Sequence, residues 1–195
     1  MRDLPELNAA VTRETYRGEK AATYDEARDR EAKWRREHDA VTEFLQGAAG
    51  TVLDIPVGTG RFLSLYRELG LEAVGFDVSD EMLSLARQKD AAARLDQGDI
   101  FGIPLPNKSV DTAVCVRLLN LITEDEMVMA IKELARVTRD RMILSIRTGD
   151  AIGRKTRSWT HRETAFHAAV EAIGMYVRAA RMAHKGNYRV ILITP

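Results

Sequence analysis

Short apolar runs alternate with amphipathic helical segments along most of this 195-residue chain, and this alternation constrains the fold more than any other feature. Strand-like apolar runs lie at 51–55, 72–76, 93–96, 110–122 (strongest at its start) and 142–146. Segments with helical spacing lie between them, at 61–69, from 79 onward and from 123 to 137. Strands that are apolar on both faces are typical of a parallel sheet covered by helices on each side. The sequence therefore predicts an α/β, doubly wound, mostly parallel sheet.

Capping and turn residues add detail to this prediction. Capping residues precede three predicted helices: Ser79, Thr123 with Glu126, and Thr160 with Glu163. Side-chain oxygens at such positions accept hydrogen bonds from the first N–H groups of a helix. A further helix is therefore expected to start at Thr160 and to end at Gly174. Two β-like runs, 176–183 and 188–194, flank the turn-forming residues 184–187 and predict a closing antiparallel hairpin.

The first 47 residues differ in character from the rest of the chain. Residues 1–18 are polar and irregular, whereas 19–46 are typical of one or two helices rich in alanine, glutamate and arginine. Two glycines, at 47 and 50, interrupt this pattern. We therefore predict an N-terminal helical lid at 1–47 and a main domain at 48–195.

Composition and charge exclude several classes of protein. Twenty-nine basic and 29 acidic side chains give a net charge of zero, which argues against a protein that wraps polyanions. The single cysteine, Cys115, excludes an intramolecular disulfide and a cysteine-rich zinc site. No predicted helix carries histidines and carboxylates at metal-ligand spacing, so we expect no metal. The sequence has no apolar run of 18 residues and no signal-peptide core, which predicts a cytoplasmic protein without a membrane span.

A glycine-containing bend directly after the first predicted strand indicates a ligand site. The sequence Asp54-Ile-Pro-Val-Gly-Thr-Gly-Arg61 precedes a helix, and Asp77 ends the next strand, 19 residues after Gly58. Ligands of open parallel sheets bind at the carboxyl ends of strands, where a carboxylate can accept hydrogen bonds from both hydroxyls of a ribose. These features favour an adenosine-containing ligand. Leu63 replaces the third glycine of a dinucleotide fingerprint, and no Walker A sequence follows the bend.

Four segments, in the same order, resemble the motifs of the class I S-adenosylmethionine-dependent methyltransferases, in their small single-domain branch. They are Val52-Leu-Asp-Ile-Pro-Val-Gly-Thr-Gly-Arg-Phe62, Val74-Gly-Phe-Asp-Val-Ser-Asp-Glu-Met-Leu83, Gln97-Gly-Asp-Ile100 and Ser109-Val-Asp-Thr-Ala-Val114. The likeness runs from about residue 24 to the C-terminus. It implies a seven-stranded, Rossmann-like sheet that ends in an antiparallel hairpin, and S-adenosyl-L-methionine as the cofactor.

The resemblance also implies which residues hold that cofactor. Asp54, Gly58 and Gly60 would line its methionine part. Asp77 would hold the ribose hydroxyls, and Asp99 would accept a hydrogen bond from the adenine amino group. The complete implied set of cofactor-binding residues is Tyr24, Asp54, Pro56, Gly58, Gly60, Asp77, Val78, Met82, Asp99, Ile100 and Arg117.

Pro56 departs from the family pattern, because it stands where the first glycine of the motif is usual. Proline fixes φ near −65° and has no N–H, so this position can contribute only a carbonyl oxygen. The motif keeps its function if the position needs neither a positive φ nor a donor. A catalytically inactive protein that still binds the cofactor is the alternative interpretation.

No catalytic side chain stands out, since methyl transfer needs a base only when the acceptor must lose a proton. His161 is a weak candidate, and a solvated histidine is the alternative. Cys115 is expected to be a core residue. Segment 147–162, predicted as a loop, holds five basic residues, one acid and Trp159. It is either a lid that recognises an anionic acceptor or a solvated loop with a hydrophobic plug.

The sequence thus predicts an S-adenosylmethionine-dependent methyltransferase. The acceptor is expected to be a small molecule, held between residues 1–47 and 147–162. An RNA or protein methyltransferase is one alternative, because basic side chains beside a tryptophan could bind a nucleic acid strand. A non-catalytic cofactor-binding partner that regulates a second protein is the other. Both a monomer and a homodimer are compatible with the sequence.

Overall fold

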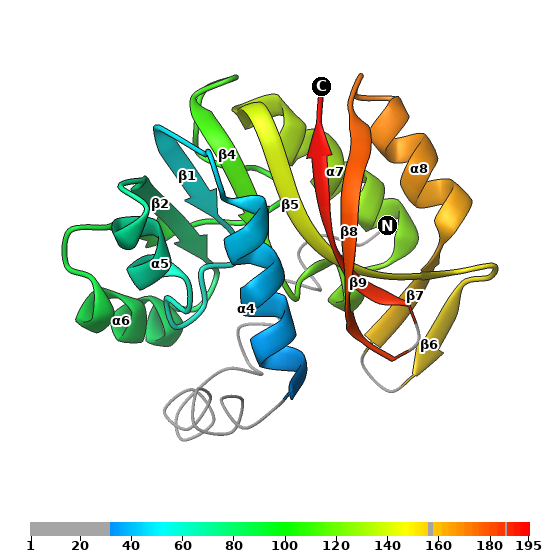
Figure 1. Cartoon of the computed structure of the whole chain (residues 1–195), viewed down its shortest axis with the longest axis horizontal. Coiled ribbons are helices and arrows are strands. Elements are labelled where there is room, and N and C mark those ends of the chain that lie inside the picture. The colour runs from blue at the N-terminus through cyan, green and yellow to red at the C-terminus, as the bar shows by residue number, and fades with distance from the viewer. Residues whose placement is uncertain (1–31, 156–157, 186) are drawn as a thin grey trace, which may run out of the picture.

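The computed structural model describes residues 32–155, 158–185 and 187–195, which form a mixed sheet with helices on both faces (Figure 1). The strands of the main sheet are β1 (Thr51–Asp54), β2 (Glu72–Asp77), β3 (Arg94–Gln97), β4 (Val110–Cys115), β5 (Thr138–Gly149), β8 (Tyr176–His184) and β9 (Tyr188–Thr194). Their order is β3-β2-β1-β4-β5-β9-β8. The first five are parallel, whereas β9 pairs antiparallel with both β5 and β8. The predicted fold class and closing hairpin are confirmed.

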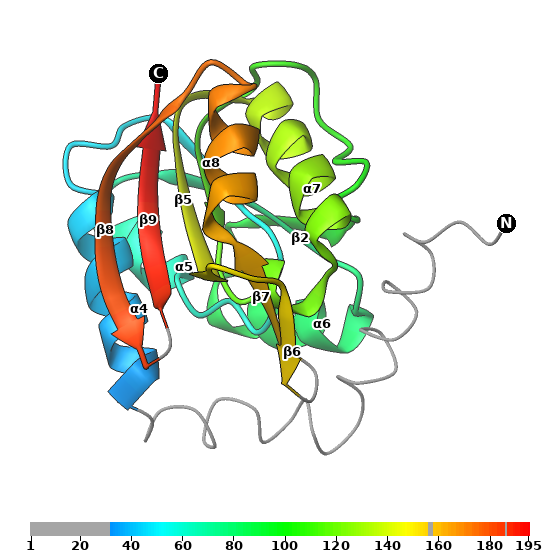
Figure 2. The same ribbon diagram turned by 90° about the vertical axis from the view of Figure 1, so that its right-hand side faces the viewer.

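The helices divide between the two faces of the sheet. Helices α4 (Ala32–Phe44), α5 (Leu63–Glu68) and α6 (Asp80–Lys89) bury apolar side chains in one core cluster. Helices α7 (Glu124–Val137) and α8 (Glu163–Glu171) form the other cluster, on the opposite face. Figure 2 shows α7 and α8 side by side, with β8 and β9 between them and α4. None of the described helices combines the length and the apolar character needed to cross a bilayer.

Two of the three predicted helix caps are present. The Ser79 hydroxyl accepts a hydrogen bond from the Met82 N–H at 3.3 Å, and Thr123 and Glu126 form a complete capping box at the start of α7. The prediction that Thr160 caps the last helix is wrong. Thr160 lies within strand β7 (Ser158–Arg162). Helix α8 begins at Glu163, and its N-cap residue, Arg162, makes no side-chain cap hydrogen bond. Pairing with neighbouring strands has overridden the local capping pattern.

The described part of segment 147–162 is a strand ribbon, not the predicted loop. Strand β5 extends to Gly149, and the short strands β6 (Gly153–Lys155) and β7 pair antiparallel with each other. β7 also pairs parallel with the end of β5, through Thr148↔His161 and Gly149↔Arg162. The backbone hydrogen bonds of β7 are therefore partly satisfied by the main sheet, which fixes this segment beside the carboxyl end of β5.

Candidate functional site

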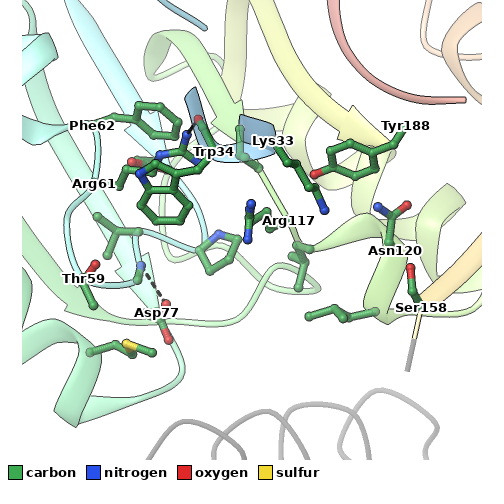
Figure 3. Close-up of a pocket in the computed structure, with 18 residues that line it drawn as sticks. Lys33, Trp34, Thr59, Arg61, Phe62, Asp77, Arg117, Asn120, Ser158 and Tyr188 are labelled. Carbon is green, nitrogen blue, oxygen red and sulfur yellow. Dashed lines mark hydrogen bonds between the residues drawn. The ribbon is translucent and has the colours of Figure 1, made fainter. Parts of the chain in front are cut away.

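A cavity of about 250 Å³ lies beyond the carboxyl ends of β1, β2 and β4 (Figure 3). In the sheet, β2 and β3 lie on one side of β1, and β4 and β5 lie on its other side, so the strand order reverses at β1. Open α/β sheets bind ligands at such a reversal. A smaller cavity of about 40 Å³ adjoins it. Pro56, Asp77 and Leu118 line both cavities, so the two form neighbouring parts of one site.

Most of the cofactor residues implied by the sequence line these cavities. The larger cavity contacts Asp54, Pro56, Gly58, Asp77, Met82 and Arg117. The smaller one contacts Pro56, Asp77, Val78, Asp99 and Ile100. Gly60 lines neither cavity, and Tyr24 lies outside the described residues. Three of the four motif segments, with Arg117 just after the fourth, thus converge on one place, as a shared ligand requires.

Asp77 lies where the two cavities meet, and its carboxylate is fixed by backbone donors. One oxygen, Oδ2, accepts the Gly58 N–H at 2.9 Å, and the other, Oδ1, accepts the Ser79 N–H at 2.9 Å. Burial raises the pKa of Asp77, while the hydrogen bonds from Ser79 and Gly58 oppose that shift. Each carboxylate oxygen can accept more than one hydrogen bond, so both retain acceptor capacity toward the cavity.

The two glycines of the bend have different physical roles. Gly58 has φ +56°, lines the cavity, and has nothing within 4 Å of the position that a Cβ would occupy. Its missing side chain therefore keeps space open for a ligand. Gly60 has φ +75°, and a Cβ there would lie 2.6 Å from Leu63 Cδ1 and 3.1 Å from Ala86 Cα. Gly60 is thus required by the packing of α5 on α6, and the structure gives it no cavity contact.

This difference predicts unequal costs for two alanine substitutions. Gly58→Ala should cost only the left-handed backbone strain, about 1–2 kcal/mol. Gly60→Ala adds an overpacking penalty of roughly 1–3 kcal/mol, because the Ala86 backbone cannot move aside cheaply. Urea denaturation of the two variants measures the free energies of unfolding. Equal losses, or a larger loss for Gly58→Ala, would contradict this account of Gly60.

Asp54 ends β1 as a buried carboxylate, exposed by only 2%. The Tyr66 hydroxyl donates a hydrogen bond to its Oδ2 at 3.1 Å. Burial raises the pKa of Asp54 from 3.8 to about 7, and the nearby Asp77 adds to the rise, whereas the Tyr66 hydrogen bond and Arg61 oppose it. The free protein therefore holds a carboxyl group at the cavity that changes its charge near neutral pH.

The smaller cavity has the features of a site for a flat, apolar ring with one polar edge. Ile100 and Phe101 supply apolar lining, and Ile100 is 4% exposed. The Asp99 Oδ1 accepts the Phe101 N–H at 3.0 Å, which orients the carboxylate within its loop. A carboxylate in that position can accept a hydrogen bond from an amino group of a ligand.

A buried ion network connects α4 to the cavity. Glu37 is fully buried, and its Oε2 accepts hydrogen bonds from Arg61 Nη1 and Arg117 Nε, each at 2.8 Å. Arg61 also donates to the Trp34 carbonyl oxygen and lies 3.6 Å from the Trp34 ring centroid. Burial raises the pKa of Glu37, but Arg117 and Arg61 outweigh burial and hold it below its ordinary value. Helix α4 is thereby fastened to the loop after β1 and to the end of β4.

Several lining residues were not predicted from the sequence. They include Lys33, Trp34, Arg61, Asn120, Ser158 and Tyr188. Arg61 had a local signal, since it directly follows the second glycine of the bend. No local sequence signal marked Tyr188 or Lys33 as lining residues, because β9 and α4 reach the cavity only through tertiary packing. Phe62, the last residue of the first motif segment, is 4% exposed and also lines the cavity.

His161 and Cys115 are both buried away from the cavity lining. His161, in β7, is fully buried, and its Nε2 lies 2.7 Å from the Leu119 carbonyl oxygen, which fixes that nitrogen as the donor. Burial lowers its pKa, and neither cavity contacts it. The structure therefore gives His161 a role in holding β7 to the short helix η1 (Leu119–Leu121). Cys115 is a fully buried core residue, as predicted.

The described residues fit an adenosine-containing sulfonium ligand. An anchored carboxylate lies where a ribose would be held, the smaller cavity suits a ring with an amino group, and Gly58 leaves an open cradle. Asp54 offers a negative charge on the side of the larger cavity. These are complementary groups for a ligand that combines a nucleoside with a cationic methionine part.

Comparison with known proteins agrees with this geometry. A sequence model described as a methyltransferase domain matches residues 52–141. The chain is 32% identical over 130 residues to a malonyl-acyl-carrier protein O-methyltransferase from Pectobacterium atrosepticum, covering 62% of this chain and 51% of that protein. It is 39% identical over 88 residues to a demethylmenaquinone methyltransferase from Deinococcus radiodurans, covering 42% of this chain and 36% of that protein. The chain thus spans about half, or less, of the length of these curated relatives.

Solved structures share the fold over nearly the whole chain. Magnesium protoporphyrin IX methyltransferase from Synechocystis PCC 6803, with bound S-adenosylmethionine, superposes with a TM-score of 0.78 at 18% identity and covers 96% of both chains. A Burkholderia thailandensis 1,6-didemethyltoxoflavin-N1-methyltransferase has a TM-score of 0.72 at 19% identity and covers 100% of this chain and 91% of its own. The matched methyltransferase domain, the strand order and the converging motifs together support a class I S-adenosylmethionine-dependent methyltransferase.

Proposed function

We propose that this protein binds S-adenosylmethionine in the two joined cavities and transfers its methyl group to a small-molecule acceptor. The observation that carries the proposal is the position of Asp77. Its carboxylate, anchored by the N–H groups of Gly58 and Ser79, lies at the junction of the two cavities, where a ribose would join adenine to methionine. When bound, the cofactor supplies an activated methyl group on a sulfonium.

The residues of the chain would bind and orient the two reactants. Asp99 and Ile100 would hold the adenine, Asp77 the ribose, and Asp54 the cationic methionine end. Trp34 and Arg117 would cover the methionine end and exclude water from it. Holding two reactants in attack geometry can supply about 7–11 kcal/mol of the barrier without a dedicated base. This division of labour agrees with a cavity whose described acids, Asp54 and Asp77, both lie on the cofactor side.

A small acceptor is supported by the enclosure of the site and by the relatives. Helix α4 covers the larger cavity through Lys33 and Trp34, and the cavity has room for a small molecule beside a cofactor end. The names of the related proteins specify a malonyl-acyl-carrier protein, a demethylmenaquinone and a 1,6-didemethyltoxoflavin. We also propose that α4, which belongs to the lid predicted at 1–47, covers the methionine end; Tyr24 lies outside the described residues. The described part of this segment, α4, already lines the cavity.

The proposal predicts a large loss of cofactor affinity for Asp77→Ala. Hydrogen bonds to a charged acceptor contribute about 1.5–3 kcal/mol each, so losing two ribose contacts should weaken S-adenosylmethionine binding by roughly 100-fold or more. Isothermal calorimetry with S-adenosylmethionine, S-adenosylhomocysteine and NAD measures this loss and the ligand preference. Thermal unfolding should be recorded in parallel, because the same carboxylate anchors two backbone N–H groups.

The matched control is Asp80→Ala, which removes an exposed carboxylate three residues away. It should leave the affinity unchanged. The proposed ribose contact would be refuted by a folded Asp77→Ala variant that binds as the wild type does. Catalysis is tested by transfer of a labelled methyl group to small-molecule and macromolecular fractions of a cell extract. Label only in RNA or protein would refute the small acceptor, and label in no fraction would favour a regulatory role.

A further inference from the structure

The larger cavity has two chemically different halves. Figure 3 shows Thr59, Arg61 and Asp77 on one side, Lys33, Tyr188, Asn120 and Ser158 on the other, and Arg117 between them. The first side holds Asp77, which is assigned above to the ribose of the cofactor. The second side, which we call the acceptor half and define as Lys33, Asn120, Ser158 and Tyr188, contains no described carboxylate among its lining residues.

Two positive side chains lie near the Tyr188 ring: Lys33, which lines the cavity, and Arg147, which is not a lining residue itself but adjoins the lining residue Ser158. Lys33 Nζ lies 4.0 Å from the ring centroid, and the Arg147 guanidinium carbon lies 5.8 Å from it. Arg117 adds a third positive charge at the boundary between the halves, although Glu37 neutralises part of it. Burial and the charge of Glu37 raise the pKa of Tyr188 well above 10, so the phenol adds no negative charge to the acceptor half.

Arg147 differs from the neighbouring arginines in having no carboxylate partner among the described residues. Arg61 and Arg117 pair with Glu37, Arg162 pairs with Glu124, and Arg189 pairs with Glu163. Arg147 is half-buried, and the side-chain contact recorded for it is a long one, 3.5 Å from Nη1 to the Ser158 hydroxyl. A half-buried guanidinium without a counter-charge is costly, and an anion bound beside it would remove that cost.

Asn120 adds a neutral donor to the same half. Its Oδ1 accepts the Arg147 backbone N–H at 2.7 Å, and this bond determines the orientation of the amide. The amide NH₂ is therefore the end of the side chain that remains for a ligand. With the Ser158 hydroxyl, this places neutral donors beside two cations, a combination that binds anionic oxygen atoms.

We infer that the acceptor half binds an anionic oxygen group, a carboxylate or a phosphate, carried by the small acceptor. The inference rests on the proposed function, because it assumes that the other half holds the cofactor. Within segment 147–162, predicted as a possible lid for an anionic acceptor, it assigns this recognition to Arg147 on β5, and it adds Lys33 on α4. The anionic group would orient the acceptor so that a separate nucleophilic atom meets the methyl group.

Binding of simple probes to the full-length protein saturated with S-adenosylhomocysteine tests this inference. The probes are benzoate, phenyl phosphate and the neutral benzamide, measured by ligand-observed NMR. We expect at least one anion to bind about tenfold or more tightly than benzamide, consistent with one charge-assisted hydrogen bond of 1.5–3 kcal/mol. Benzoate and phenyl phosphate together distinguish a carboxylate site from a phosphate site. Equal binding of all three probes, or binding of none, would overturn the inference.

Charge-removing variants locate the effect. Lys33→Gln and Arg147→Gln should each weaken anion binding about tenfold while S-adenosylhomocysteine binding stays within twofold. The control Lys132→Gln removes an exposed lysine on α7, away from the cavity, and should change neither affinity. Anion binding that survives both substitutions would overturn the assignment of this half. Failure of S-adenosylhomocysteine to bind the wild type would instead refute the proposed function.

Discussion

Asp54→Asn is expected to stabilise the free protein at pH 8 by about 4 kcal/mol while weakening its affinity for the cofactor. The asparagine has nearly the same shape, and its carbonyl oxygen can still accept the Tyr66 hydrogen bond. It carries no charge, so the cost of burying a carboxylate disappears. The expected magnitude follows from the rise of the Asp54 pKa from 3.8 to about 7.

The sign of this effect depends on pH in a specific way. The pKa of Asp54 is higher in the folded protein than in the unfolded chain, so the fold favours the protonated form. Its favourable contribution is complete below pH 3.8 and is lost as the pH rises from about 4 to about 7. The stability gain of Asp54→Asn should therefore be near zero at pH 4, grow through pH 5 and 6, and level off above pH 7. Denaturant unfolding across this range measures it.

Cofactor binding should show the reverse dependence on pH. A sulfonium ligand favours the ionised carboxylate, so wild-type affinity for S-adenosylmethionine should fall by up to tenfold for each pH unit below 7. S-adenosylhomocysteine lacks the sulfonium charge and should depend less on pH. The Asn variant should lose this dependence. A stability gain that does not vary with pH would show that Asp54 is ionised throughout, contrary to the burial argument.

Glu37→Gln is expected to cost about 3–5 kcal/mol of folding free energy. The carboxylate is completely buried, and one of its oxygens binds both Arg61 and Arg117, whose side chains are 9% and 16% exposed. Removing the negative charge takes away the carboxylate with which both mostly buried guanidinium groups pair. The lowered pKa of Glu37 means that its stabilisation is present above its ordinary value of 4.5 and is lost as the pH falls below it.

The damage should centre on α4, which this network holds in place. Hydrogen exchange of the amides of residues 34–44 should accelerate in Glu37→Gln more than exchange in β4 or β5. Glu43→Gln is the matched control on the same helix, because its pair with Arg181 is about half exposed and contributes at most about 1 kcal/mol. Comparable losses in the two variants would mean that burial of Glu37 is not what makes its ion pairs important.

The sequence was sufficient to predict those elements and site residues whose signals lie between near neighbours in the chain. Asp54 at the end of β1, Gly58 in the bend and Asp77 at the end of β2 lie within 24 consecutive residues. The elements that carry them each have their own pattern of apolar spacing or glycine placement. Ser79 and Thr123 cap their helices as expected, because capping is a contact between near neighbours. The sheet order then brings these segments together without further information.

Long-range contacts were not predictable in this way. Glu37 and Arg117 are 80 residues apart, and nothing in either segment indicates that the two side chains meet. Thr160 and Glu163 carry a capping pattern, but pairing of β7 with the ends of β5 and β6 outweighs it. The cationic acceptor half has the same origin. It combines residues of α4, η1, β7 and β9, and none of these segments indicates such a site by itself.

The far separation of these elements has a consequence for biosynthesis. Helix α4 is among the earliest described parts to leave the ribosome, whereas β9, which supplies Tyr188, is the last. The cofactor side of the larger cavity could form once β4 has been translated. The acceptor half also requires β9, which supplies Tyr188. On the proposed function, a nascent chain would complete its nucleoside-binding residues before its acceptor-binding residues, so methyl transfer would have to follow the synthesis of β9.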